Sequence, residues 1–458
     1  MLSADIGNAY LNADCQEKVY LYAGPEFGSH AGQRVIITRA LYGLKSSGAA
    51  WRAHLAQTMM DMGFKPCVAD PDVWMRSATK ENGDKYYEYV LIYVDDLLVC
   101  SLQAAKIMET LAGVYQFKED PVTKAKYGPP ERYLGANIAL YTLPNRKDGK
   151  QHWSMSADSY VKASIKNVEH KMAKTQRKLP VCVDCPMSPA YCPELDVSPL
   201  LSPELTNYYQ NLVGVLRWSV ELGRIDIHLA VSLLSQYLAQ PREGHLEQVF
   251  RIFGWLKLHD RSRIVFDDGI IDWDNKFNDV DWREFYPDAE EPVPGNAPEP
   301  RGPELQINCF VDADHAGNRI TRRSHTGVLI FCNKSPILWF SKRQNTVETS
   351  TFGSEFIALK IATEMIQGLR YKLRMMGVAL DGPANVFCNN QSVVINSTIL
   401  ESTLKKKHVS ICYHRAREAC AMQMIQIAYE GTKSNLADCL TKTLPGTTLT
   451  HLLQKFLY

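Results

Sequence analysis

Apolar and polar positions alternate in short runs over about the first 143 residues of the chain. The clearest run is Tyr86–Val94, which is rich in aromatic and β-branched residues and predicts a strand. A second apolar run, Leu97–Cys100, follows after only two acidic residues, Asp95 and Asp96. Two strands with so short a connection predict a β-hairpin with an acidic turn.

The stretch from residue 144 to 283 has a helical pattern. Apolar residues recur three and four positions apart at Leu212, Val215, Leu216 and Val220. A second helix is predicted up to Pro241, where proline ends it, and a third over Gly244–Leu258. We therefore expect this region to be mainly helical.

A proline-rich segment separates this region from the C-terminal part of the chain. Six prolines and several acidic residues fall within residues 284–304, which favours an extended linker. Beyond it, strands are predicted at Leu305–Val311, Thr326–Cys332 and Ala384–Cys388, with helices after Ser354, near 408–422 and near 435–442. The sequence thus predicts a multidomain protein of the α/β and α+β classes, with domains at 1–143, 144–283 and 305–458.

Composition narrows the class of protein. Of the 458 residues, 45% are hydrophobic and 22% charged, which provides material for several cores and is not the profile of a disordered chain. The net charge of +1 neither requires nor excludes a nucleic-acid partner. No run of eighteen apolar residues occurs, so no membrane partner is expected. The twelve cysteines show no disulfide framework, and the cluster Cys182, Cys185 and Cys192 lacks a fourth zinc ligand.

Adjacent carboxylates in the predicted hairpin form a first candidate site. Asp95 and Asp96 are flanked by apolar strands, and a divalent cation would relieve the repulsion between their charges. The alternative is an ordinary acidic turn, although Asp-Asp is not a favoured pair in tight hairpin turns. Asp5 lies upstream, and three carboxylates on neighbouring strands could hold two Mg²⁺ ions.

A second set of acidic residues follows the proline-rich segment. Asp312 ends a predicted strand, Glu355 lies near the start of a helix, and Asp438 follows Asn435. For Asp438 the alternative is a helix-dipole role in the first turn of a helix that Asn435 caps. By themselves these residues leave both interpretations open.

The motifs around the first site resemble those of reverse transcriptases from copia-type retrotransposons. Asp5–Tyr10 is similar to the first palm motif of the family and Tyr93–Asp96 to its second catalytic motif. Leu41–Lys45 with Trp51, and Tyr133–Gly135, are similar to further family motifs. The resemblance implies that Asp5 and Asp95 are the main metal ligands and that Asp96 supports them. It also implies that Tyr10 is the sugar gate, whose ring collides with a ribonucleotide 2′-OH; a core-packing role for this ring stays open.

The C-terminal segments resemble the RNase H domain of the same elements. Asp312, Glu355 and Asp438 match three of the four acids that hold two Mg²⁺ ions in the family, and the fourth position carries Asn389 instead of aspartate. An amide loses one charge and one metal-binding oxygen, so we expect impaired cleavage. His408 would assist product release or proton transfer, and a solvated role beside the lysines at 405–407 is the alternative.

The resemblance implies a palm with a thumb or connection region, followed by an RNase H-like domain of a Pol polyprotein. Expected cofactors are Mg²⁺ ions, two per site, with Mn²⁺ as a substitute. Expected partners are an RNA template, a DNA primer, an RNA–DNA hybrid and deoxynucleoside triphosphates, with a homodimer or other Pol subunits as protein partners. The expected location is intracellular, in a cytoplasmic virus-like particle or in the nucleus.

This chain departs from the family pattern in three places. Gly48 stands where the family usually has proline, and Asn389 replaces an acid. Only four residues precede Asp5, so we expect the fingers to lie upstream and the chain to begin inside the polymerase domain. The alternative function is that of a decayed or domesticated, non-catalytic protein that binds RNA or hybrid duplex, or of a structural subunit.

Overall fold

The computed structural model describes residues 1–458 except 145, 147–148, 274–275, 278–279 and 405–406. Lys405 and Lys406 of the expected lysine run therefore lie outside the described residues. The chain forms two compact units. The first contains residues 1–134, 296–303 and 372–379, and the second contains 135–295, 304–371 and 380–458.

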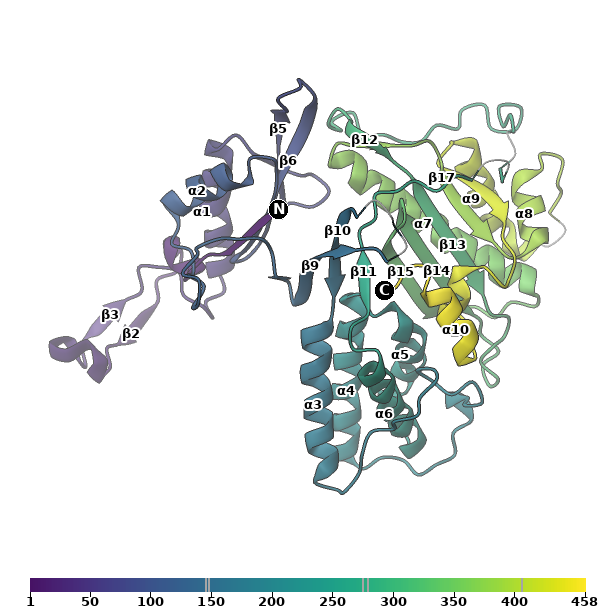
Figure 1. Ribbon diagram of the computed structural model, residues 1–458, viewed down its shortest axis with the longest axis horizontal. Helices are drawn as coiled ribbons and strands as arrows, with labels where there is room; N and C mark the ends of the chain where they lie inside the picture. Colours follow the sequence, from purple (N-terminus) through teal and green to yellow (C-terminus); the bar gives the residue numbers. More distant parts are fainter. Residues whose placement is uncertain (145, 147–148, 274–275, 278–279, 405–406) are drawn as a thin grey trace. The chain divides into compact units, whose positions relative to one another are not determined.

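The first unit is built on a five-stranded antiparallel sheet. Its order is β1 (Leu2–Asp5), β7 (Asp96–Cys100), β6 (Lys85–Tyr93), β5 (Val73–Thr79) and β4 (Lys65–Pro66). Helix α1 (Ser47–Asp61) buries Trp51, Leu55 and Met59, which lie on one face at four-residue spacing, in the same core as α2 (Ala104–Val114). The hairpin of β2 (Tyr20–Tyr22) and β3 (Arg34–Ile36) projects from this unit (Figure 1). A short strand, β8 (Arg132–Tyr133), lies at the end of the first of the three segments that make up this unit.

The second unit begins with a small sheet and four helices. Strands β9 (Ala136–Thr142), β10 (Gln151–Ser156) and β11 (Arg263–Val265) pair antiparallel. Helices α3 (Asp158–Ala173), α4 (Pro203–Glu221), α5 (His228–Leu234) and α6 (Glu243–Leu258) pack together as a bundle (Figure 1). The mainly helical character expected for this region is thus present.

A mixed five-stranded sheet follows in the same unit. Its order is β15 (Ser335–Arg343), β14 (His325–Cys332), β13 (Ile307–Ala313), β17 (Ala384–Cys388) and β18 (Ile425–Tyr429). The first three strands are antiparallel neighbours, whereas β13, β17 and β18 run parallel. The helices of this part are α7 (Thr351–Met375), α8 (Gln391–Thr398), α9 (Ser410–Ala421) and α10 (Gly446–Leu453).

One hydrophobic core joins the helical bundle to this mixed sheet. It contains Leu216 and Phe253 from the bundle together with Phe310, Leu329 and Phe387 from the sheet. Burial of apolar surface is the main favourable term in folding, so this shared core explains why the two regions form one unit. The boundaries at 143, 283 and 304 stay predictions.

The structure confirms the expected multidomain mixture of helices and sheets and differs in two local elements. The end of the expected linker forms a strand, β12 (Arg301–Leu305), which pairs with β16 (Val378–Leu380). The helix expected near 435–442 is a five-residue 3₁₀ turn, η7 (Leu436–Leu440), which Asn435 caps as expected. Among the described residues, no helix is both long and apolar enough to cross a bilayer.

Candidate active sites

Strand pairing brings the three N-terminal carboxylates together at one end of the first sheet. Asp5 on β1 lies directly opposite Asp96 on β7. The backbone N–H of Ile6 donates to the carbonyl of Asp95 at 2.8 Å, which ties the end of β1 to the hairpin turn. Burial, with the nearby charges of Asp95 and Asp5, raises the pKa of Asp96. The geometry therefore disfavours negative charge here unless a cation is present.

A lysine already supplies such a cation. The Nζ of Lys118 lies 2.6 Å from Oδ1 of Asp5 and 3.5 Å from Oδ2 of Asp95. Hydrogen bonding to Asp5 raises the pKa of Lys118, although partial burial opposes this. Sequence reasoning missed Lys118 because it lies 113 positions from Asp5 and its segment carries no distinctive pattern. The site thus accepts a positive charge between the carboxylates of Asp5 and Asp95.

The hairpin turn itself is strained. Tyr93 pairs with Asp96, so the two turn residues are Val94 and Asp95. Val94 has φ +58°, a region that a β-branched residue rarely adopts. The indole N–H of the buried Trp51 donates to the Val94 carbonyl at 2.7 Å. This bond holds the strained turn that positions Asp95.

Removing that hydrogen bond should weaken cation binding at the candidate site of Asp5, Asp95 and Asp96 without emptying the core. We expect Trp51→Phe to weaken Mn²⁺ binding roughly fivefold, because one buried hydrogen bond contributes about 1 kcal/mol. Electron paramagnetic resonance titration of Mn²⁺ measures this affinity. The part of the Mn²⁺ binding that Asp95→Asn removes is the part that belongs to this site. Trp74→Phe, in the same core but on β5, is the matched control. Equal Mn²⁺ affinity in Trp51→Phe and Trp74→Phe would contradict the positioning role.

Tyr10 lies near the carboxylates in a short 3₁₀ turn, η1 (Ala9–Asn12). Its ring packs against Tyr42 with 4.4 Å between the ring centroids, and both line the neighbourhood of the first site. Tyr10 also contributes to a cavity of about 210 Å³ with Trp51 and Tyr93. The structure is therefore compatible with the ring being packed and facing a ligand space at once.

The second set of candidate residues meets at one edge of the mixed sheet. Asp312 lies on β13 and Asn389 directly follows β17, and these strands are parallel neighbours, so their carboxyl ends share an edge. The Nδ2 of Asn389 donates to Asp312 at 2.7 Å and lies 3.5 Å from Asp438. Asp438 is in η7, and Glu355 is in the first turns of α7.

Burial and neighbouring charges raise the pKa values of two acids at this second site. Asp312, Glu355 and Asp438 are all buried. Burial, together with the charge of Asp312, raises the pKa of Glu355 to about 9 and raises that of Asp438 as well. Within the described part of the chain, Oε2 of Glu355 and Oδ1 of Asn389 have no hydrogen-bond partner. Buried acceptors without a donor fit a site that takes a cation.

A lysine and a threonine that sequence reasoning missed complete this site. The Nζ of Lys442 lies 3.1 Å from Asp312 and 3.4 Å from Asp438. The Thr441 hydroxyl donates to Oδ2 of Asp312, the same oxygen that Lys442 approaches at 3.1 Å. Lys442 follows Asp438 by four positions, a spacing that brings side chains together on a helical turn. This spacing is the sequence feature from which the contact could have been predicted.

His408 is exposed and pairs with Glu348 at 3.2 Å between Nε2 and Oε2. No contact between His408 and the acids of the second site is recorded among the described residues. Its expected role in product release or proton transfer stays a prediction.

A third group of side chains, outside both predicted sites, has a spacing that is compatible with a metal ion. Among the described residues, His152, Asp267 and Asp268 have ligand atoms within 4.8 Å of one another. Arg146 pairs with Asp267 at 2.9 Å and Lys150 with Asp268 at 2.7 Å. Each carboxylate of this trio is thus paired with a cation, as Asp5 is with Lys118.

Comparison with known proteins decides the family of the first site. Residues 1–167 match the family described as "Reverse transcriptase (RNA-dependent DNA polymerase)". Residues 1–167 are a reverse transcriptase domain. The predicted motifs from Asp5 to Gly135 all lie within this reverse transcriptase domain.

Relatives of the whole chain are Pol polyproteins of transposons. The chain is 24% identical over 454 residues to the retrovirus-related Pol polyprotein from transposon RE1 of Arabidopsis thaliana, covering 98% of this chain and 27% of the relative. It is 25% identical to that from transposon TNT 1-94 of Nicotiana tabacum, covering 96% and 29%. The chain thus spans less than a third of the length of these relatives. The expected resemblance to copia-type elements is confirmed.

Two solved structures are also similar to parts of this chain, with TM-scores below 0.5. One is LC11-RNase H1 in complex with RNA/DNA hybrid, with 20% identity and a TM-score of 0.25, covering 30% of this chain and 94% of that one. The other is a foamy viral protease-reverse transcriptase in complex with double-stranded DNA, with 11% identity and a TM-score of 0.21, covering 97% and 60%.

Proposed function

We propose that this chain acts as an RNA-directed DNA polymerase that extends a DNA primer on an RNA template with deoxynucleoside triphosphates. The observation that carries the proposal is the convergence of Asp5, Asp95 and Asp96 within a reverse transcriptase domain, with an ammonium group between two of them. Three carboxylates on adjacent strands at the end of a sheet are suited to phosphoryl transfer with divalent cations.

Asp5, Asp95 and Asp96 would hold the Mg²⁺ ions, a role supported by the contacts of the Lys118 ammonium group with Asp5 and Asp95. Bound there, the ions would activate the attacking hydroxyl and stabilise the leaving phosphate. The protein contributes position: Trp51 holds the turn, and the β1–β7 pairing holds Asp5 opposite Asp96. With cations held there, the Lys118 ammonium group would be released from Asp5, and its charge would be free to contact the triphosphate.

Tyr10 is the proposed sugar gate of this site. Its ring is supported by Tyr42, so a 2′-OH that meets it cannot simply push it aside. A rise in ribonucleotide relative to deoxyribonucleotide incorporation by Tyr10→Val measures this role, and an unchanged ratio returns Tyr10 to core packing.

Primer extension on an RNA template tests the polymerase proposal. Within a Pol polyprotein of its relatives' length we expect Mg²⁺-dependent synthesis, and we expect Asp95→Asn to lower it at least about a hundredfold, the scale lost when one charge-stabilising group is removed from an active site. Asp14→Asn is the matched control, because Asp14 is an exposed acid of the same unit that pairs with Arg39. Synthesis that survives Asp95→Asn would overturn the proposal.

A second candidate function concerns the C-terminal region alone. We propose that it binds an RNA–DNA hybrid and cleaves it weakly or not at all. The specific observation is that the position of the fourth acid carries Asn389, whose amide donates to Asp312, while Lys442 contacts the same carboxylate. The oxygens of Glu355 and Asn389 that have no hydrogen-bond donor still fit a site for Mg²⁺, which Asp312, Glu355 and Asp438 would hold. Hybrid binding without cleavage by the unaltered chain is the expected result.

A further inference from the structure

A cationic cavity lies away from both carboxylate sites, between α4, α5 and the end of β15. Its volume is about 360 Å³. Arg217 on α4 and Lys342 and Arg343 on β15 line it, and Glu221 is the carboxylate among its lining residues. All of these residues belong to the second unit. The cavity therefore has an excess of positive charge.

The three cations outnumber the single carboxylate, Glu221, in this cavity, and none of them forms an ion pair with it among the described residues. Among the described residues, Arg217, Lys342 and Arg343 make no ion pair and no side-chain hydrogen bond, whereas Arg177 on the same unit pairs with Glu247 at 2.5 Å. His228 also lines the cavity, and its buried Nδ1 has no hydrogen-bond partner. Burial, with the charge of Arg217, lowers the pKa of His228 to about 4, so its ring is neutral at physiological pH. The cavity thus presents donors and charge that an anion would satisfy.

Hydrogen bonds across three elements fix the wall of this cavity. The Ser232 hydroxyl on α5 donates to the Ser341 carbonyl on β15 at 2.7 Å. The Ser341 hydroxyl donates in turn to the Leu440 carbonyl of η7 at 2.7 Å. The anion site is therefore connected rigidly to the turn that carries Asp438, which limits the cost of ordering it on binding.

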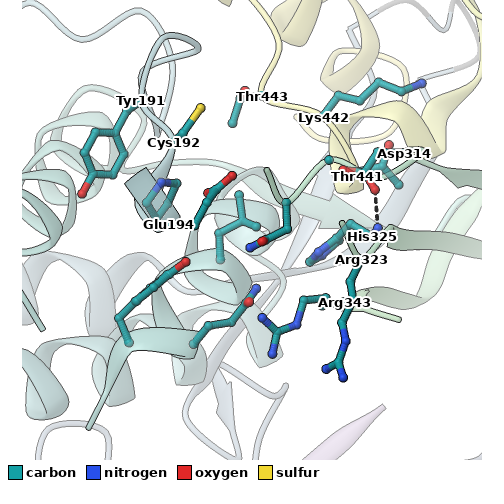
Figure 2. A pocket seen from close by; sticks show the side chains of 16 residues that line it. Tyr191, Cys192, Glu194, Asp314, Arg323, His325, Arg343, Thr441, Lys442 and Thr443 are labelled. Carbon is teal, nitrogen blue, oxygen red and sulfur yellow. Dashed lines mark hydrogen bonds between the residues drawn. The ribbon is translucent and has the colours of Figure 1, made fainter. Parts of the chain in front are cut away.

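A path of cations leads from this cavity to the second carboxylate site. Arg343 also lines a neighbouring cavity of about 250 Å³, together with Arg323, Asp314 and Lys442 (Figure 2). Lys442 contacts Asp312 and Asp438. A strand whose backbone reaches the acids can therefore continue past Arg343. Guanidinium groups bind phosphate oxygens with two parallel hydrogen bonds, which favours a phosphodiester as the anion.

We propose that the cavity lined by Arg217, Lys342 and Arg343 binds a backbone phosphate of the nucleic acid that lies at Asp312 and Asp438. The inference deepens the proposed hybrid binding and rests on it. It assigns to the bundle helix α4 a share in holding the strand, so that the helical region and the mixed sheet grip one ligand together. The contact is to the backbone and carries no base specificity.

Salt-dependent binding of an RNA–DNA hybrid tests the site. Fluorescence anisotropy with the full chain and with Arg217→Gln and Arg343→Gln, between about 0.05 and 0.3 M salt, gives the slope of log affinity against log salt. Each variant should bind about fivefold to tenfold more weakly near 0.1 M salt and lose roughly one unit of slope, whatever the sequence of the hybrid. Arg217 is exposed, so its replacement leaves the fold intact. Arg261→Gln, an exposed arginine elsewhere on the same unit, is the matched control and should change neither quantity.

Competition separates the sources of the phosphate. Millimolar inorganic phosphate or deoxynucleoside triphosphate should not displace the hybrid, and displacement that depends on Arg343 would show that the cavity is a site for free phosphate instead. Unchanged slopes in Arg217→Gln and Arg343→Gln, or no hybrid binding by the unaltered chain, would overturn the inference. Loss of slope together with primer synthesis that survives Asp95→Asn would support the phosphate site and contradict the polymerase proposal alone.

Discussion

Replacing Asn389 by aspartate should raise Mg²⁺-dependent cleavage of the RNA strand in an RNA–DNA hybrid by about a hundred- to thousandfold. Two Mg²⁺ ions carry four positive charges, and Asp312, Glu355 and Asp438 offset three of them. The added carboxylate would lie where the Asn389 amide now donates to Asp312 at 2.7 Å. The substitution would replace the amide group, a hydrogen-bond donor, with a carboxylate that can bind a metal ion beside the reacting phosphate.

The same change should also alter stability in a way that depends on metal. Without Mg²⁺, Asn389→Asp exchanges a hydrogen bond for repulsion beside the buried Asp312, so the melting temperature should fall. Saturating Mg²⁺ should restore it. Asn390→Asp is the matched control, because Asn390 is the N-cap of α8, where aspartate serves equally well. Equal cleavage by the unaltered chain and by Asn389→Asp would place Asn389 outside the metal site.

Breaking the ion pair between Arg224 and Asp226 should cost about 3–5 kcal/mol in the free energy of unfolding of the second unit. The pair is bidentate, at 2.9 and 2.6 Å, both side chains are 1% exposed, and the indole N–H of Trp255 donates to Asp226 at 2.6 Å. Asp226→Ala would leave the Arg224 charge buried and unpaired. Chemical denaturation measures the loss.

A matched exposed pair and the pH dependence sharpen this test. Glu247→Ala, which removes the exposed partner of Arg177, should cost less than about 1 kcal/mol. Burial by itself raises the pKa of Asp226, but Arg224 and the hydrogen bonds outweigh it and the net pKa is lowered. Because the folded-state pKa is depressed, the contribution of the pair is complete above the ordinary pKa of aspartate and disappears only as pH falls through the lowered value. A similar cost for both substitutions would show that the buried pair has no special role.

The local pattern of residues predicted the strands well where apolar, aromatic or β-branched residues form a short run. The aromatic and β-branched run at Tyr86–Val94 is β6 within one residue, and Ala384–Cys388 is β17 with the same bounds. The positions of Asp5, Asp95 and Asp96 followed from motif resemblance, while the register that places Asp5 opposite Asp96 depends on the folded sheet. The 3₁₀ geometry of η7 was not predicted, because a capped acidic turn has the same sequence signature as an α-helix start.

The basic residue of the first site could not be predicted from local sequence. Lys118 is a lysine in a polar segment, and only tertiary structure places its ammonium group against Asp5, whereas Lys442 could have been found from its four-residue spacing to Asp438. The positive φ of Val94 was equally hidden, because β-branched residues ordinarily avoid it and Trp51, 43 positions away, holds it. Long-range hydrogen bonds and ion pairs, not propensities, determine these details.

The hydrophobic core shared by the helical bundle and the mixed sheet determines how this protein can be divided for experiments. An expression clone that begins at the proline-rich segment would contain every acid of the second site. It would lack Trp273 and Phe277, whose rings contact Phe387, and the bundle residues that share its core. Large exposed apolar patches promote aggregation. A soluble C-terminal fragment should therefore start near residue 135, and genetic exchange between related elements would preserve this block as a single inherited piece.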